Sequence, residues 1–137
     1  MLNRDTFVRS VASMATDIRQ HMGRVGERLA LQHLERLGYR LVAQNHRTRF
    51  GELDLIVCDD ERLVFVEVKA RRATARAGSA VEAISPDKQR RVRAMAAAWL
   101  AATTDRPRSR ELRFDVIAIT VDRHGRLMAL DHLEAAF

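Results

Sequence analysis

The hydrophobic pattern at the start of the chain predicts a helix. Residues 17–37 carry apolar side chains at steps of three or four positions, which places them on one helical face. Gly38 follows this run and predicts the helix end. Gly23 and Gly26 are poor residues for a helix interior, so we expect the firm part of the helix to begin near Arg24.

A second helix is predicted to start after Ser85. Ser85 suits an N-cap, Pro86 suits the first helical position, and Asp87 is an acid in the first turn. Its apolar face comprises Val92, Met95, Ala96, Trp99 and Leu100. Runs rich in β-branched and apolar residues predict strands at residues 39–44, 53–58, 63–68, 112–121 and 127–130. Polar stretches predict loops at residues 45–50, 71–79 and 103–110.

This order of elements constrains the topology. The long helical crossover between the third and fourth strands makes them parallel neighbours, and the hairpins make the other pairs antiparallel. Residues 53–58 and 63–68 are apolar on both faces apart from a few charges, which is typical of strands covered on both sides by helices. We therefore predict an α/β fold with a mixed sheet of about five strands between two helical layers.

The few charges in these strands fall at informative positions. Because side chains alternate along a strand, Glu52 and Asp54 share one face, and so do Glu67 and Lys69. A hairpin centred between Asp60 and Glu61 places Asp54 opposite Glu67 and Glu52 opposite Lys69. A loop one residue shorter or longer would split these charges between the two faces, so the clustering favours the first register.

Composition limits the class of protein. The 137 residues suffice for one domain, which we place at residues 17–137, with residues 1–16 as a flexible extension that lacks the apolar core of a signal peptide. The net charge of +6 favours a polyanionic partner. The lone Cys58 excludes an intrachain disulfide and favours a reducing compartment, so we expect a cytoplasmic protein. The longest uncharged run, Ala94 to Thr104, is far shorter than the ~20 apolar residues that span a bilayer, so we expect no membrane-spanning segment.

Two carboxylates this close within an apolar sheet require compensation. One of the pair Asp54 and Glu67 could hold a proton, Lys69 could neutralise part of the charge, or a divalent cation could bind between them. Mg²⁺ prefers a few carboxylates together with waters and phosphate oxygens. The bland alternative is a buried charge cluster that satisfies itself and has no catalytic role.

At this point the sequence resembles a known family. Residues 51–56, Gly-Glu-Leu-Asp-Leu-Ile, followed by residues 65–69, Phe-Val-Glu-Val-Lys, resemble the Asp…Glu-x-Lys motif of the restriction-endonuclease-like nuclease superfamily. More narrowly, the chain resembles the YraN family of small bacterial proteins, which is related to archaeal Holliday-junction resolvases. The resemblance extends from about Gly23 to Phe137, and Leu53 stands where the superfamily usually has proline.

The resemblance implies roles for individual residues. Asp54 and Glu67 would be metal ligands for Mg²⁺ or Mn²⁺, with the backbone carbonyl of Val68 as a third ligand. Lys69 would position or activate the attacking water, and Glu27 would join the metal site from the first helix. The implied fold is a three-layer α/β/α restriction-endonuclease-like domain, and the implied activity is hydrolysis of DNA phosphodiesters.

Other charged residues have two readings each. Glu52 could pair with Lys69, bond to the loop or support the metal, and Asp115 could be a turn residue or support the site. Lys88 and Arg91 could reach a phosphate or form a solvated helix end. Basic loop residues suit contacts with backbone phosphates, which give affinity without sequence readout. The complete set of expected nucleic-acid contacts is Arg47, Arg49, Arg71, Arg72, Lys88 and Arg91.

The sequence therefore favours a metal-dependent, nuclease-like protein that acts on DNA, with structure-selective cutting of branched DNA by analogy with resolvases and a homodimer that presents two sites. The alternative is a non-catalytic module that keeps the nuclease fold and binds nucleic acid or another protein. A third reading is a structural protein with a self-satisfied charge cluster. Metal dependence distinguishes the enzyme from the other two.

Overall fold

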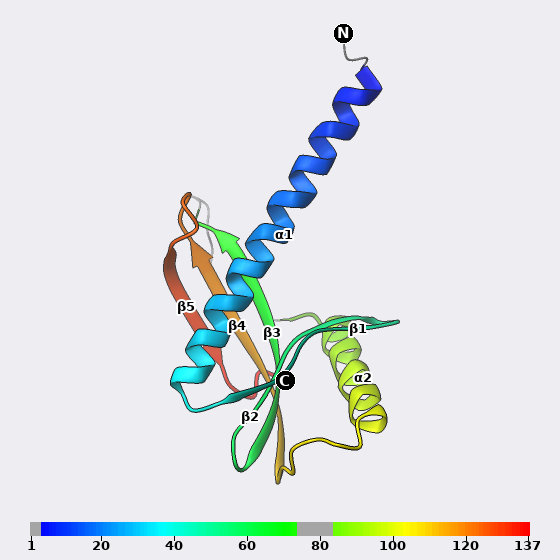
Figure 1. Cartoon of the computed structure of the whole chain (residues 1–137), viewed down its shortest axis with the longest axis vertical. Coiled ribbons are helices and arrows are strands. Elements are labelled where there is room, and N and C mark those ends of the chain that lie inside the picture. Colours follow the sequence, from blue (N-terminus) through cyan, green and yellow to red (C-terminus); the bar gives the residue numbers. More distant parts are fainter. Residues whose placement is uncertain (1–3, 74–83) are drawn as a thin grey trace.

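The protein folds into a five-stranded sheet with one helix on each face (Figure 1). The computed structural model describes residues 4–73 and 84–137, with side chains from residue 20 onward. The elements are α1 (Arg4–Arg36), β1 (Arg40–Thr48), β2 (Gly51–Cys58), β3 (Arg62–Arg72), α2 (Pro86–Ala102), β4 (Glu111–Val121) and β5 (Leu127–Leu133). This confirms the predicted α/β class and the predicted order of helices and strands. In the described part of the chain, no helix is both long and apolar enough to cross a membrane.

The strands lie side by side in sequence order, β1-β2-β3-β4-β5. Only β3 and β4 are parallel among these neighbours, as the α2 crossover between them requires. The β2–β3 hairpin pairs Leu55 with Val66 and Cys58 with Leu63, which is the register predicted from the charge pattern. The ladder stops at Leu55 and Val66, so Asp54 and Glu67 are the next residues beyond its last pair.

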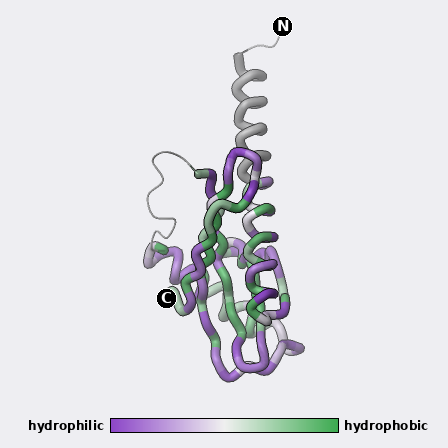
Figure 2. Tube along the Cα trace, turned by 90° about the vertical axis from the view of Figure 1, so that its left-hand side faces the viewer, coloured by the Kyte–Doolittle hydropathy of each residue, from purple (hydrophilic) through white to green (hydrophobic). Residues whose placement is uncertain are grey.

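Each face of the sheet has its own apolar core. Figure 2 shows hydrophobic positions along the strands and hydrophilic ones concentrated at the turns. On the α1 side, Leu34 packs against Val57, Val64 and Ile117. On the α2 side, Met95 and Trp99 pack against Phe65. The central strands β2, β3 and β4 are thus buried on both faces, which explains why they lack simple apolar–polar alternation.

The helix signals read from the sequence are confirmed. Gly38 adopts φ +96°, its N–H donates to Glu35, and the N–H of Tyr39 donates to the carbonyl of Leu34, which together form a Schellman motif. At the start of α2, the Ser85 hydroxyl accepts the N–H of Lys88 at 3.2 Å. Two short polar signals therefore fix where α1 ends and where α2 begins.

The predicted start of α1 near Arg24 is wrong, because the helix begins at Arg4. Gly26 lies inside it for a packing reason. A Cβ atom at this position would lie 2.5 Å from the Cβ of Ala70 on β3, closer than real contacts allow. Only glycine lets the helix approach the strand this closely, and this benefit outweighs its low helix propensity.

The predicted polar loop at residues 45–50 is also wrong, because β1 continues to Thr48. His46, Arg47 and Thr48 pair with Leu53, Glu52 and Gly51, so backbone hydrogen bonding within the hairpin overrides the polar side chains. The predicted loop at residues 71–79 begins later than expected, since β3 runs to Arg72, and residues 74–79 lie outside the described residues.

Candidate metal centre

The candidate site lies where β2 separates from β3. Leu55 packs on the α1 side of the sheet, whereas Leu53 packs on the α2 side, so the alternation of β2 breaks at Asp54. The Oδ2 atom of Asp54 accepts the backbone N–H of Val68 at 2.8 Å. A side chain therefore satisfies a β3 backbone donor just past the end of the ladder, and this bond holds Asp54 between the two strands.

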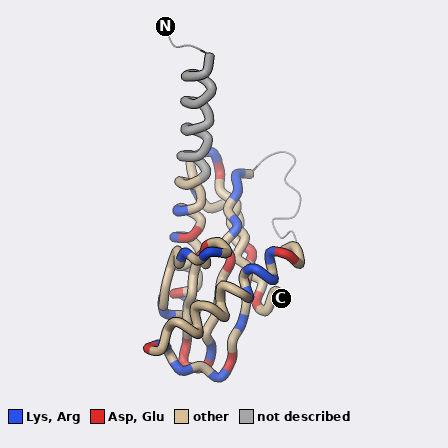
Figure 3. Tube along the Cα trace, turned by 90° about the vertical axis from the view of Figure 1, so that its right-hand side faces the viewer, with Lys and Arg blue, Asp and Glu red and all other residues tan. Residues whose placement is uncertain are grey.

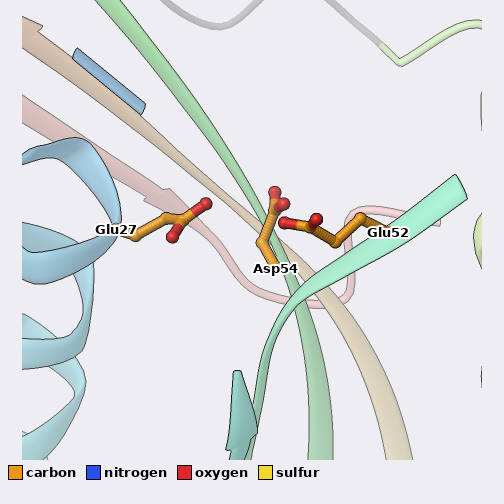
Figure 4. Close-up of side chains that lie close together, drawn as sticks. All are labelled: Glu27, Glu52 and Asp54. Carbon is orange, nitrogen blue, oxygen red and sulfur yellow. The ribbon is translucent and has the colours of Figure 1, made fainter. Parts of the chain in front are cut away.

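Three carboxylates converge at this point. Glu27 comes from α1, while Glu52 and Asp54 come from β2 (Figure 4). One oxygen atom from each lies within 4.8 Å of the others, and all three side chains are half-buried. Close approach of α1 through Gly26 brings the neighbouring Glu27 to the sheet. We call Glu27, Glu52 and Asp54 the acidic triad.

Burial and repulsion by neighbouring carboxylates disfavour the charged forms of Asp54 and Glu27. Burial raises the pKa of Asp54 to about 8, and the nearby charges of Glu67 and Glu27 act in the same direction. Burial also raises the pKa of Glu27, with Glu52 and Glu67 adding to it, while a hydrogen bond with Asn45 opposes the shift. The triad therefore carries more negative potential than its surroundings compensate.

Glu67 lies beside the triad but has its own counterion. Its Oε1 atom is 3.0 Å from the Nζ atom of Lys88 in the first turn of α2. The Glu67 side chain is 12 % exposed and that of Lys88 is 34 % exposed, so the pair is only partly screened by water. The sequence left Lys88 either as a phosphate contact or as part of a solvated helix end, and the structure pairs it with Glu67, which was expected as a metal ligand.

A hollow of about 420 Å³ opens next to the triad, between α1 and the β1–β2 hairpin. Arg47 lies 3.7 Å from Glu52 at its rim, and Arg24 and Asn45 also line it. Sequence reasoning missed Arg24 and did not assign a role to Asn45, whose φ of +51° is unusual for a residue other than glycine. The hollow gives the triad an open side toward solvent.

Lys69 is the second residue after Glu67 on β3, so the two point to the same face of the sheet. The Lys69 side chain is half-buried.

The basic residues predicted to contact nucleic acid are spread over several elements. Arg49 lies over the Phe50 ring at the β1–β2 turn, with 4.7 Å from Cζ to the ring centroid, and Arg91 is exposed on α2. Arg71 and Arg72 end β3.

Asp115 belongs to a different cluster. It is fully buried and accepts two hydrogen bonds of 2.8 Å from Arg113, one from His132 at 2.8 Å and one from the N–H of Ala135. Arg113 also donates to the hydroxyl of Tyr39 at 2.7 Å. These bonds lower the pKa of Asp115 against the opposing effect of burial. Asp115 thus ties β4 to the ends of β1 and β5 and does not join the triad.

The donor set of the triad fits a hard divalent cation. Carboxylate oxygens are the ligands that Mg²⁺ and Mn²⁺ take, and a cation between them would offset the burial and the repulsion that raise the pKa of Asp54. Glu27, Glu52 and Asp54 could hold such an ion, and Glu67, paired with Lys88, lies beside them. Among the described residues, the triad is a cluster in which carboxylate oxygens converge and one side is open to solvent.

Residues 26–119 match the family described as "Uncharacterised protein family UPF0102". A UPF0102 protein of Pelotomaculum thermopropionicum is 44% identical over 121 residues, covering 88% of this chain and 98% of the relative. One from Mycolicibacterium gilvum is also 44% identical, with 87% and 95% covered, and one from Syntrophus aciditrophicus is 41% identical, with 84% and 90% covered. The matched region contains the whole acidic triad, Glu67 and Lys69. The chain belongs to the UPF0102 family, also known as the YraN family.

Proposed function

We propose that this protein is a metal-dependent nuclease that hydrolyses phosphodiester bonds in DNA. The observation that supports this most is the convergence of Glu27, Glu52 and Asp54 at the point where β2 leaves β3. A structural cluster would neutralise its acids, as Arg113 does for Asp115. The pKa values of Asp54 and Glu27 are instead raised, which is the state expected of a site built for an added cation.

The residues of the chain take distinct roles in this proposal. Asp54, Glu27 and Glu52 would hold Mg²⁺ or Mn²⁺, with Glu67 and the backbone carbonyl of Val68 as further ligands. The bound ion supplies charge stabilisation for the phosphate and lowers the pKa of water. Lys69 orients the attacking water from the α2 side of β3. Its compact ammonium suits this role better than a guanidinium would.

Lys88 acts in two states. In the metal-free protein it neutralises Glu67 at 3.0 Å. With a cation held at that carboxylate, Lys88 would be available to a substrate phosphate, where a positive charge favours the negative charge that develops during hydrolysis. The N-cap by Ser85 fixes the first turn of α2 and keeps Lys88 within reach throughout.

The substrate class follows from charge and size. The net charge of +6 and the arginines near the site suit DNA backbone contacts. We infer branched DNA as the preferred substrate by analogy with resolvases, and a homodimer that presents two sites to two strands. The buried, unpaired Cys58 suits a cytoplasmic location.

The decisive experiment is a cleavage assay with a metal-binding measurement. Purified protein is incubated with Mg²⁺ or Mn²⁺ and with single-stranded, duplex, flap and four-way-junction DNA, beside Asp54→Asn, Lys69→Ala and the control Asp60→Asn. Asp60 makes a surface pair with Arg40 and its side chain is 96% exposed. We expect cleavage by wild type and Asp60→Asn only, and Mn²⁺ binding by every variant except Asp54→Asn.

Two results would contradict the proposal. Equal cleavage by all four proteins would identify a contaminating nuclease. DNA binding that is the same with and without Mg²⁺, together with no cleavage and no Mn²⁺ binding, would support the non-catalytic module instead.

A further inference from the structure

A second hollow lies on the other side of α1 from the triad. It has a volume of about 160 Å³ and is bounded by α1, the end of β3 and the turn between β4 and β5. Val25 and Val121 form its buried floor, while His21, Arg72, Arg123 and His124 are exposed around it. Figure 3 shows basic positions at these strand ends beside α1. Pockets for drug-sized ligands measure roughly 300–1,000 Å³, so this volume favours a smaller group.

The ionisable side chains around this hollow are all arginine or histidine. Two guanidinium groups and two imidazoles line the hollow, and none of its described lining residues is acidic. Asp122 lies in the same turn, but its Oδ1 atom accepts the backbone N–H groups of His124 and Arg126 and is used to hold the turn. Arginine forks and imidazole N–H groups match the oxygens of a phosphate.

The two hollows flank α1 on different faces. The triad-side hollow is lined by Arg24 and Glu27, whereas this one is lined by His21, Met22 and Val25, so the two share no residue and lie on different faces of α1. A helix with its side chains is about 10–12 Å wide, close to the roughly 12 Å of a DNA major groove. One strand at the triad and a second strand at this hollow therefore fit a duplex placed across α1.

We propose that the hollow between His21, Arg72, Arg123 and His124 binds a backbone phosphate of the DNA strand opposite the one at the acidic triad. This inference rests on the proposed function, since it uses the same DNA substrate. The two arginines supply the charge. His124 Nε2 accepts the Nε–H of Arg123 at 3.2 Å, which leaves its Nδ1–H and the ring of His21 as additional donors. The apolar floor of Val25 and Val121 keeps water from competing beneath the phosphate.

The test is DNA binding in EDTA, where cleavage cannot occur. Wild type is compared with the double variant Arg72→Ala/Arg123→Ala on a 20-bp duplex and on a 20-nucleotide single strand, between 50 and 200 mM NaCl. The control Arg108→Ala/Arg110→Ala removes the same charge from the segment before β4. Thermal melting verifies that each protein is folded.

We expect the pocket variant to bind duplex about tenfold more weakly, with a salt slope reduced by about 0.9, the value for one lost phosphate contact. Its affinity for the single strand, and the affinities of the control, should stay within about twofold of wild type. Equal losses for both double variants would overturn the site, because net charge alone would explain them. An equal loss on single strand and duplex would overturn the assignment to the second strand.

The outcomes also separate this inference from the proposed function. Wild type that fails to bind any duplex overturns both. Wild type that binds duplex without ever cutting it, while the pocket variant binds it tenfold more weakly, removes the nuclease assignment and leaves the phosphate site standing.

Discussion

Two clusters of buried charge in this molecule use carboxylates in opposite ways. Asp115 is surrounded by Arg113, His132 and the N–H of Ala135, and its pKa is lowered. Asp54 has one backbone donor and acidic neighbours, and its pKa is raised to about 8. The carboxylate of the first cluster is neutralised by neighbours within the chain, whereas the acids of the second cluster could hold a cation. The comparison therefore separates an acid that stabilises the fold, Asp115, from an acid in a candidate metal site, Asp54.

The largest effect is expected at Asp115. Substitution Asp115→Ala leaves the guanidinium of Arg113, which is 8% exposed, without its main partner. An uncompensated buried charge costs about 3–5 kcal/mol, so the free energy of unfolding should fall by that amount. Urea denaturation followed by circular dichroism measures it. A loss below about 1 kcal/mol would mean that the network contributes little and that the comparison with the triad fails.

The opposite sign is expected at Asp54. Substitution Asp54→Asn keeps an oxygen to accept the Val68 N–H but removes a charge repelled by Glu67 and Glu27. We expect the metal-free protein to gain about 1–3 kcal/mol in free energy of unfolding, consistent with a raised pKa. Calorimetric titration should show Mn²⁺ affinity reduced by at least about 100-fold. Destabilisation of the metal-free protein would show that Asp54 is a structural acid like Asp115.

The pH dependence of stability should separate the clusters again. Because the pKa of Asp54 is raised in the folded state, the folded protein holds a proton that the unfolded chain releases between pH 4 and about 8. Stability from this group therefore falls as pH rises through that window. Asp115 has a lowered pKa, so its stabilisation is present above pH 4 and is lost in more acidic solution. Melting temperatures across pH 3–9 measure both limbs.

Two comparison samples show which residue causes each part of the pH dependence. Asp54→Asn, and wild type saturated with Mn²⁺, should both lose much of the decline between pH 4 and 8 but keep the acid limb. If the decline persists unchanged in Asp54→Asn, it arises elsewhere in the chain.

A smaller effect is expected at Lys88. Substitution Lys88→Met removes the ammonium that competes with an added cation for Glu67. We expect Mn²⁺ affinity to rise about three- to tenfold, and the metal-free protein to lose about 1 kcal/mol or less, because the pair is partly exposed. Lys88→Arg should restore the wild-type values. Weaker Mn²⁺ binding by Lys88→Met would contradict competition between the ammonium and the metal.

Local patterns predicted the framework well. The four residues between the β-rich runs set the β2–β3 register, and Gly38 and Ser85 marked helix ends, because each signal acts over a few residues. The position of the Glu52 side chain in the triad was harder to predict. The alternation of side chains between the two faces of β2 breaks at Asp54, where the β2–β3 ladder ends. The Lys88–Glu67 pair depends on how α2 docks. The bond between Tyr39 and Arg113 joins residues 74 positions apart, beyond any local signal.

The contact between Gly26 and Ala70 has a consequence for the geometry of the acidic triad. A single added methyl group at position 26 would have to move α1 away from β3, since the available gap of 2.5 Å cannot hold it. Glu27 is the next residue, so the same displacement would carry its carboxylate away from Asp54. A misplacement of about 1 Å can cost roughly 100-fold in rate. The lack of a Cβ atom at Gly26 therefore sets the alignment of the site, because it lets the backbone of α1 lie directly against Ala70 of β3.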